Sequence, residues 1–70
     1  MLFDFGLLRV IRRRKGLSQK SVSQALNITQ SILSKWENGF TPISCDNLAR
    51  IATLYGLADV SDFFFEKIRT

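Results

Sequence analysis

Apolar residues recur along the chain at helical spacing, three or four positions apart, over almost the whole sequence. Glycine, asparagine and proline interrupt this spacing at short intervals, where turns are expected. The pattern predicts an all-α fold of five short helices in a single domain over residues 1–70. It contains no competing strand, except that pairing of residues 1–5 with the C-terminal phenylalanines stays open.

Residues suited to helix ends separate the five segments. Side chains that can cap a helix N-terminus precede four of them, at Asp4, Ser18, Thr29 and Ser44. Residues that tolerate a left-handed conformation or end a helix follow at Gly16, Asn27, Gly39 and Gly56. The fifth segment is a brief helical turn around residues 63–65 that begins at Asp59 or Ser61.

The inward-facing positions of these helices predict the hydrophobic core. It consists of Leu8, Ile11, Val22, Ala25, Leu33, Trp36, Leu48, Ile51, Ala52 and Tyr55. The three consecutive rings at residues 63–65 cannot all face inward from one helical turn, and we expect Phe64 to close the core. The other rings leave apolar area for a partner.

Charge is distributed unevenly between the two halves of the chain, which has an overall formal charge of +4. Residues 1–35 carry seven basic residues and one acidic residue, a net charge of +6. Residues 36–70 carry three basic and five acidic residues, a net charge of −2. This asymmetry suggests one face for a polyanion and another for protein contact, with a merely solvated basic helix as the alternative.

The residue inventory excludes several kinds of chemistry. The chain has no histidine and one cysteine, Cys45, which excludes zinc fingers, disulfide scaffolds, Cys–His nucleophile pairs and imidazole acid–base catalysis. No apolar run is long enough to span a membrane, and the N-terminus lacks a secretory hydrophobic region. We expect a cytoplasmic protein that is not an enzyme and that uses no cofactor, metal, membrane or small-molecule ligand.

The second and third predicted helices have the parts of a helix-turn-helix, in which two short helices are joined by a tight turn. Ser23 supplies a small residue where the two helices cross, and Asn27 supplies the residue that tolerates a positive φ in the turn. Apolar residues at Ile28, Leu33 and Trp36 then fix the second helix on the first.

Several separated motifs resemble the Xre/Cro family of lambda-repressor-like helix-turn-helix regulators. They are Gly16, Leu17, Ser18 and Gln19, the segment of residues 29–39, Pro42 and the helix over residues 48–56. The resemblance spans residues 8–64. It departs from the usual pattern in three places, with Ser23 in place of alanine, Asn27 in place of glycine, and one extra residue near Asp59.

The resemblance implies which residues contact DNA. Base-reading positions fall on Gln30, Ser31 and Lys35, with Thr29 and Ser34 beside them. A glutamine can bind adenine N6 and N7, and a lysine can reach guanine O6 and N7. Phosphate-binding positions fall on Ser18, Gln19 and Asn38, partly through amides at helix N-termini, with Lys20 and Thr41 as candidates by proximity. The alternative for all of these residues is ordinary solvated surface.

Arg12 lies on the edge of the inward face of the first helix, where an unpaired charge is costly. Glu37, at the end of the third helix, matches the family's partner in an Arg–Glu pair that braces the first helix against the third. A bidentate guanidinium–carboxylate contact makes such burial tolerable. Direct contact of Arg12 with DNA is the alternative, and the two roles are compatible.

The resemblance also implies a homodimer, with its contact in the C-terminal part of the chain, about residues 57–70. The expected interface residues are Leu57, Phe63 and Phe65. The alternative is that these aromatic side chains pack against the chain's own N-terminus at Leu2, Phe3 and Phe5.

These observations predict a sequence-specific transcriptional regulator that binds double-stranded DNA, as a homodimer on a pseudo-palindromic operator. It would exclude RNA polymerase from a promoter or touch it from a neighbouring site. A protein-interaction module such as an antitoxin or anti-repressor is the rival hypothesis. The third helix argues against it, since its outer positions Gln30, Ser31, Ser34 and Lys35 are polar and contain no acid before Glu37. RNA binding lacks its usual aromatic platform.

Overall fold

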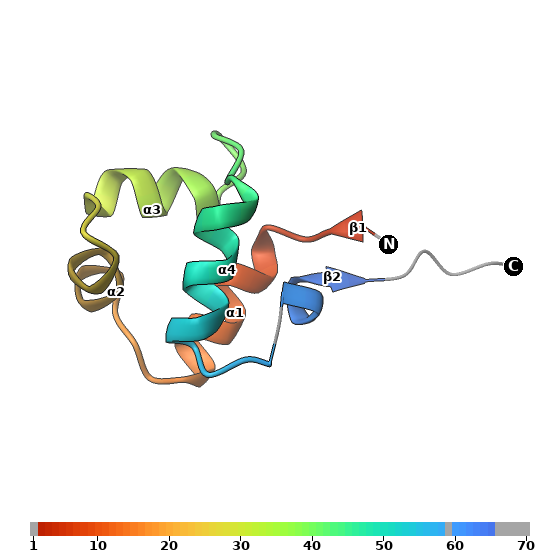
Figure 1. Cartoon of the computed structure of the whole chain (residues 1–70). Coiled ribbons are helices and arrows are strands. Elements are labelled where there is room, and N and C mark those ends of the chain that lie inside the picture. Colours follow the sequence, from red (N-terminus) through yellow and green to blue (C-terminus); the bar gives the residue numbers. More distant parts are fainter. Residues whose placement is uncertain (1, 59, 66–70) are drawn as a thin grey trace, which may run out of the picture.

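The structure is a computed structural model that describes residues 2–58 and 60–65. Its elements are β1 (Leu2–Phe3), α1 (Gly6–Arg14), α2 (Gln19–Leu26), α3 (Gln30–Glu37), α4 (Cys45–Leu54), the 3-10 helix η1 (Val60–Phe63) and β2 (Phe64–Phe65). Figure 1 shows α3 along one side of the helical body, with the two short strands on another side of it. The helix α3 packs against α1 and α2, and α4 packs against α2 and η1.

Four of the five predicted helices are present, and the prediction of a fifth α-helix is wrong. In its place lies η1, one short 3-10 turn that begins at Val60 rather than Ser61, while Asp59 is outside the described residues. The chain then enters β2, which pairs antiparallel with β1, with Leu2 opposite Phe65 and Phe3 opposite Phe64. Pairing of the two chain ends is the possibility that the sequence left open, and it stops a helix from continuing through residues 64 and 65.

Three of the four residues predicted to cap a helix act as N-caps, and the prediction for Asp4 is wrong, because Phe5 is the N-cap of α1 and no side chain caps that helix. Ser18 accepts a hydrogen bond from the backbone amide of Ser21 at 3.0 Å in a reciprocal capping box, and Thr29 accepts one from Ile32 at 3.1 Å. Ser44 caps α4 in the same way. Asp4 accepts from the amide of Gly6 at 2.9 Å, although Phe5 occupies the N-cap position of α1.

Two of the left-handed residues show why the sequence needs them. Asn27 has a φ of 59° directly after α2, and its left-handed conformation begins the short turn over residues 27–29 that leads into α3. Gly39 has a φ of 74°, and a Cβ atom at this position would lie 2.7 Å from the Phe5 ring. The ring of Phe5 therefore covers the end of α3, and glycine at position 39 leaves room for that ring.

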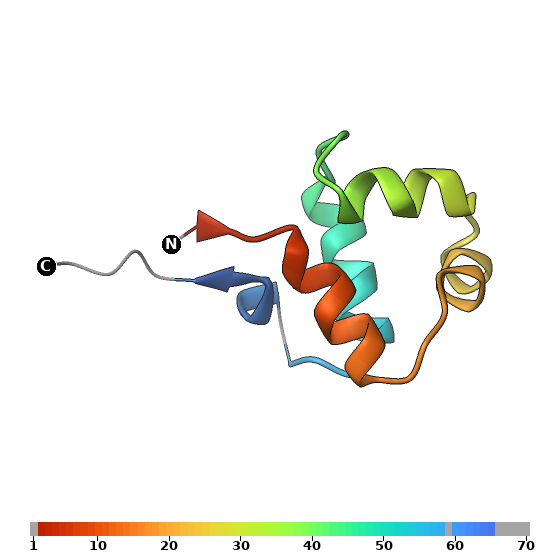
Figure 2. The same cartoon turned by 180° about the vertical axis from the view of Figure 1, so that it is seen from behind.

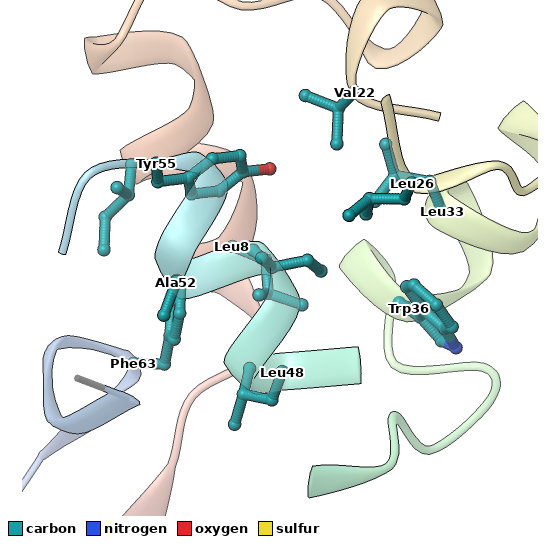
Figure 3. Close-up of a cluster of buried hydrophobic side chains, with 11 residues drawn as sticks. Leu8, Val22, Leu26, Leu33, Trp36, Leu48, Ala52, Tyr55 and Phe63 are labelled. Atoms are coloured by element: carbon teal, nitrogen blue, oxygen red, sulfur yellow. The ribbon is translucent and has the colours of Figure 1, made fainter. Parts of the chain in front are cut away.

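The core lies between α1, α2, α3 and α4 and contains most of the predicted side chains (Figure 3). Leu8, Ile11, Val22, Leu33, Trp36, Leu48, Ile51, Ala52 and Tyr55 are all buried as expected. The prediction for Ala25 is wrong, because Ala25 is exposed and the next residue, Leu26, is buried in its place. At that point α2 is ending, and the larger side chain occupies the space beside α4.

The ring that closes the core is Phe63, and the prediction of Phe64 is wrong. Phe63 is fully buried at the end of η1 and lies edge-on to Tyr55, with ring centroids 6.3 Å apart. Phe64 is displaced outward because β2 pairs with β1, and it packs edge-on against Phe3 at 5.4 Å. Because Phe63 is inaccessible, its predicted role in a dimer interface is also wrong.

Candidate nucleic-acid interface

The segment α2–turn–α3 holds α3 firmly against the rest of the fold. Ser23 is 3% exposed, and its hydroxyl donates to the carbonyl of Lys20 at 2.9 Å, so this small polar residue is satisfied within its own helix. The amide of Ile28 donates to the carbonyl of Ser23 at 2.9 Å, which closes the turn. Leu33 and Trp36 then anchor the inner face of α3 in the core (Figure 3).

The outer face of α3 carries polar side chains that are free of the fold. Gln30, Ser31 and Lys35, the residues predicted to read bases, are exposed, and their side chains make no hydrogen bond or ion pair to any described residue. Thr29 is exposed as well but its hydroxyl caps α3, and Ser34 is half-buried. A ligand can therefore bind these three side chains without breaking a hydrogen bond or ion pair to a described residue.

The same face carries an apolar residue that sequence reasoning missed. Ile32 is 39% exposed, beside Ser31 on α3. No sequence signal separates it from the core, because Ile32 lies four residues before the buried Trp36 and so adjoins the inward face of α3. An exposed branched aliphatic side chain can contact the methyl group of thymine in the major groove.

Behind this face, Glu37 at the end of α3 is buried among charged and polar partners. Arg12 donates from Nε to Oε2 at 2.7 Å and from Nη2 to Oε1 at 3.2 Å, and Gln19 donates from Nε2 to Oε1 at 3.0 Å. Arg9 is the third partner, with its Nε 3.5 Å from Oε1. We call Arg9, Arg12, Gln19 and Glu37 the Glu37 cluster; it joins α1, α2 and α3.

Electrostatics in the Glu37 cluster favour the ionised carboxylate. Burial alone would raise the pKa of Glu37, but hydrogen bonds from Arg12 and Gln19 and the charge of Arg12 outweigh it, and the pKa lies below 4.5. Arg12 is 6% exposed and also donates from Nη1 to the carbonyl of Leu17 at 2.9 Å. The structure thus joins the two residues expected to brace α1 against α3, and it ties them to the loop before α2.

Tyr55 lies near this cluster but outside its hydrogen bonds. Its ring is 2% exposed, and its hydroxyl has no hydrogen-bond partner among the described residues. Burial raises the pKa of Tyr55 to about 12, with a further contribution from the negative charge of Glu37 and an opposing one from Arg12. The hydroxyl therefore stays protonated at any ordinary pH.

The residues predicted to bind phosphates occupy different situations. Gln19 is half-buried and its amide is engaged by Glu37, and Ser18 is exposed with its hydroxyl in the capping box. Asn38 is exposed at the C-cap of α3, with contacts to Ser34 and to α1. Lys20 and Thr41 are exposed, and their side chains make no hydrogen bond or ion pair to a described residue.

Sequence reasoning also missed Arg9, which was counted only as part of the basic half of the chain. Its Nη2 donates to Oδ1 of Asn38 at 2.8 Å, across 29 positions in sequence. The available signal was its spacing, because Arg9 precedes Arg12 by three residues and so lies on the adjoining part of the same helix face.

The described residues give little support for a metal site or for a membrane-spanning helix. Residues 2–58 and 60–65 contain no group of three or more cysteine, aspartate or glutamate side chains able to hold a metal ion. Among the same residues, no helix combines the length and the apolar character that crossing a membrane requires. Cys45 is a free, exposed thiol.

The comparison with protein families agrees with this geometry. The family model described as helix-turn-helix matches residues 8–61, which include α1 to α4. The chain therefore belongs to the helix-turn-helix family, in its Xre, lambda-repressor-like form. This is a family of DNA-binding transcription regulators rather than of enzymes, and its domain binds double-stranded DNA. Searches of curated proteins and of solved structures found no match.

Proposed function

We propose that this protein is a sequence-specific regulator that reads base pairs by placing the outer face of α3 in the DNA major groove. The observation that carries the proposal is the contrast along α3 between an anchored inner face and three free polar side chains, Gln30, Ser31 and Lys35. Gln30 would read adenine, Lys35 would read guanine, and Ile32 would contact a thymine methyl group.

Contacts with the DNA backbone would set the register of α3 in the groove. The N-terminus of α2, which begins at Gln19 after its cap Ser18, presents backbone amides to a phosphate, and Asn38 offers its side-chain amide at the C-terminal end of α3. Lys20 and Thr41 are exposed close to these two points in sequence and would add contacts that do not depend on base sequence.

Two copies would bind one operator. A single helix of eight residues covers only a short stretch of base pairs, whereas two recognition helices about 34 Å apart read a pseudo-palindrome on one face of the duplex. Occupying such a site would repress transcription by excluding RNA polymerase, or activate it by contact from an adjacent position. With these small domains, protein concentration would control occupancy through dimerisation.

The dimer contact would involve the segment after α4. Leu57 is half-buried and lines a groove of about 420 Å³ together with Leu7, Ile11, Arg14 and Lys15. Phe65, the other remaining candidate, has a side chain outside the described part of the chain. Sedimentation equilibrium of Leu57→Ser should show weaker self-association than Leu54→Ser, a matched change at an exposed leucine outside this groove. Equal behaviour of the two variants would place the contact elsewhere.

The experiment that tests the proposed function is selection of bound duplexes from a random pool. The wild-type protein should enrich a two-fold symmetric consensus, whose half-sites include adenine and guanine at the positions read by Gln30 and Lys35. The double variant Gln30→Ala/Lys35→Ala should lose this consensus. Gln24→Ala/Arg13→Ala, which removes one side-chain amide and one positive charge from exposed positions outside both α3 and the proposed dimer groove, should keep it.

Two outcomes would count against the proposal. If the control variant lost the consensus as fully as the α3 variant, base reading by α3 would be wrong. If the wild-type protein enriched no sequence at all, the protein-interaction module would become the better explanation.

A further inference from the structure

Arg9 of α1 is placed against the end of the recognition helix. Its Nη2 donates to Oδ1 of Asn38 at 2.8 Å, and its Nε lies 3.5 Å from Oε1 of Glu37. Its side chain is 36% exposed, whereas that of Glu37 is fully buried. Arg9 therefore connects the buried Glu37 cluster with the surface at Asn38.

The charges of the Glu37 cluster do not cancel. Two arginines, Arg9 and Arg12, share the single carboxylate of Glu37. Arg12 takes both carboxylate oxygens at short distance and is buried, so the uncompensated positive charge lies at the exposed Arg9. A negatively charged group at the surface beside Arg9 would neutralise this remaining positive charge.

Arg9 also has hydrogen-bond donors to spare. A guanidinium has five N–H groups, of which the contacts with Asn38 and Glu37 use one on Nη2 and the one on Nε. Both N–H groups of Nη1 make no hydrogen bond to a described residue. Free N–H donors on a positively charged, partly exposed guanidinium can bind phosphate oxygens.

The contact with Arg9 determines which end of the Asn38 amide is offered to a ligand. A phosphate only accepts hydrogen bonds, so Asn38 can bind one only through its Nδ2. Arg9 holds Oδ1, and Nδ2 donates to the carbonyl of Ser34 at 2.8 Å and to its hydroxyl at 3.3 Å. The second of these bonds is long and is the one a phosphate can replace.

We propose that Arg9 and Asn38 act together as a single clamp for one DNA backbone phosphate, Arg9 supplying charge and free donors and holding Asn38 in the orientation that donates. This clamp rests on the proposed function, and it assigns a DNA contact to α1. It also makes Arg9 a positioning residue for Asn38.

The test uses the duplex selected by the wild-type protein and a scrambled duplex of equal length. Dissociation constants are measured by fluorescence anisotropy over a range of salt concentrations for Arg9→Ala, Asn38→Ala, the double variant and Arg9→Lys. Arg13→Ala is the control, because it removes the same charge from α1 at an exposed residue outside the proposed dimer groove. Thermal melts check folding, and Arg9→Ala should melt within about 5 °C of wild type because a partly exposed ion pair contributes little.

The clamp predicts a particular pattern of losses. Arg9→Ala and Asn38→Ala should each weaken binding about tenfold on both duplexes, as expected for hydrogen bonds to a charged group. The double variant should bind about as weakly as the weaker single variant. Arg9→Ala should lower the salt dependence by about one released counterion, whereas Asn38→Ala and Arg9→Lys should leave it unchanged. Arg9→Lys should bind more weakly than wild type, since lysine lacks the fork that holds Asn38.

Three results would overturn the clamp. Arg9→Ala could bind as Arg13→Ala does, the fold-losses of the two single variants could multiply in the double variant, or the loss could fall on the selected duplex alone. In each case the wild-type protein still binds its selected duplex, so the proposed function stands without the clamp. If the wild-type protein selects no duplex, the proposed function itself fails.

Discussion

The two faces of α3 differ in what surrounds their polar groups. On the inner side, Glu37 is fully buried and shares its carboxylate among Arg9, Arg12 and Gln19, so each of its oxygens is engaged. On the outer side, the side chains of Gln30 and Lys35 are exposed and make no hydrogen bond or ion pair to a described residue. The same helix thus combines a fixed attachment with a free surface.

This difference separates stability from recognition. Changes that leave the buried Arg12 or Glu37 unpaired should damage the fold, because a charge left unpaired in the interior is costly. Changes on the outer side should leave the fold intact and alter only what α3 binds. Each of the following measurements tests one side of that division.

The largest effect is expected for Glu37→Ala. The change leaves Arg12 buried without its carboxylate and should lower the free energy of unfolding by about 3–5 kcal/mol. Asp46→Ala is the control: Asp46 is an exposed acid in the first turn of α4, and its removal should cost about 0.3–1 kcal/mol. Urea unfolding measures both. Equal losses in the two variants would mean that the Glu37 cluster does not stabilise the fold.

Lowering the pH should reduce the contribution of Glu37 to stability, on the inner side of α3, before it alters the outer side. The pKa of Glu37 is lowered in the folded protein, so its contribution to stability is complete above the pKa of the unfolded chain. That contribution is lost as the pH falls through the lowered value. Between about pH 6 and about pH 3, the urea midpoint of the wild-type protein should fall further than that of Glu37→Gln. Parallel pH profiles would show that Glu37 does not carry this dependence.

Substitutions on the outer face should affect binding without affecting stability. Gln30→Ala and Lys35→Ala should each cost about 1–3 kcal/mol of binding free energy on the selected site and relax the preference at one base position. Their urea midpoints should match the wild type, since both side chains are exposed and make no hydrogen bond or ion pair to a described residue. Binding to a panel of single-base variants measures the effect, and a uniform loss on every sequence would contradict base reading.

The smallest effect is expected for Tyr55→Phe. The buried hydroxyl has no partner among the described residues, and the Glu37 cluster is complete without it. Removing it should leave the stability unchanged or raise it by about 1 kcal/mol, because an unsatisfied buried hydroxyl is unfavourable. A clear loss of stability in urea unfolding would mean that the Tyr55 hydroxyl makes a hydrogen bond that stabilises the fold.

The sequence predicts those parts of the fold that depend on local chemistry. Ser18, Thr29 and Ser44 cap the helices that follow them, and Asn27 turns the chain where a positive φ is needed. These features depend on a few neighbouring residues, so a single sequence is enough to recognise them.

The errors arise where distant parts of the chain decide the outcome. Of the three consecutive phenylalanines, Phe63 rather than Phe64 is buried, because pairing of β2 with β1 fixes the register from the other end of the chain. The contact of Arg9 with Asn38 likewise joins residues 29 positions apart. The pairing of Arg12 with Glu37 spans a similar separation and was anticipated through family resemblance, not through local pattern.

Titration of the selected duplex into isotopically labelled protein, followed by the backbone and side-chain amide signals in NMR spectra, tests the central claim most directly. The largest shifts should fall on the outer face of α3, including the side-chain amide of Gln30, and on the N-terminus of α2. The groove lined by Leu7 and Leu57 should be affected only through contact between the two bound copies, so its signals should shift less than those of α3. If the shifts instead gathered around that groove and left Gln30 and Lys35 unmoved, α3 would not be the element that reads DNA.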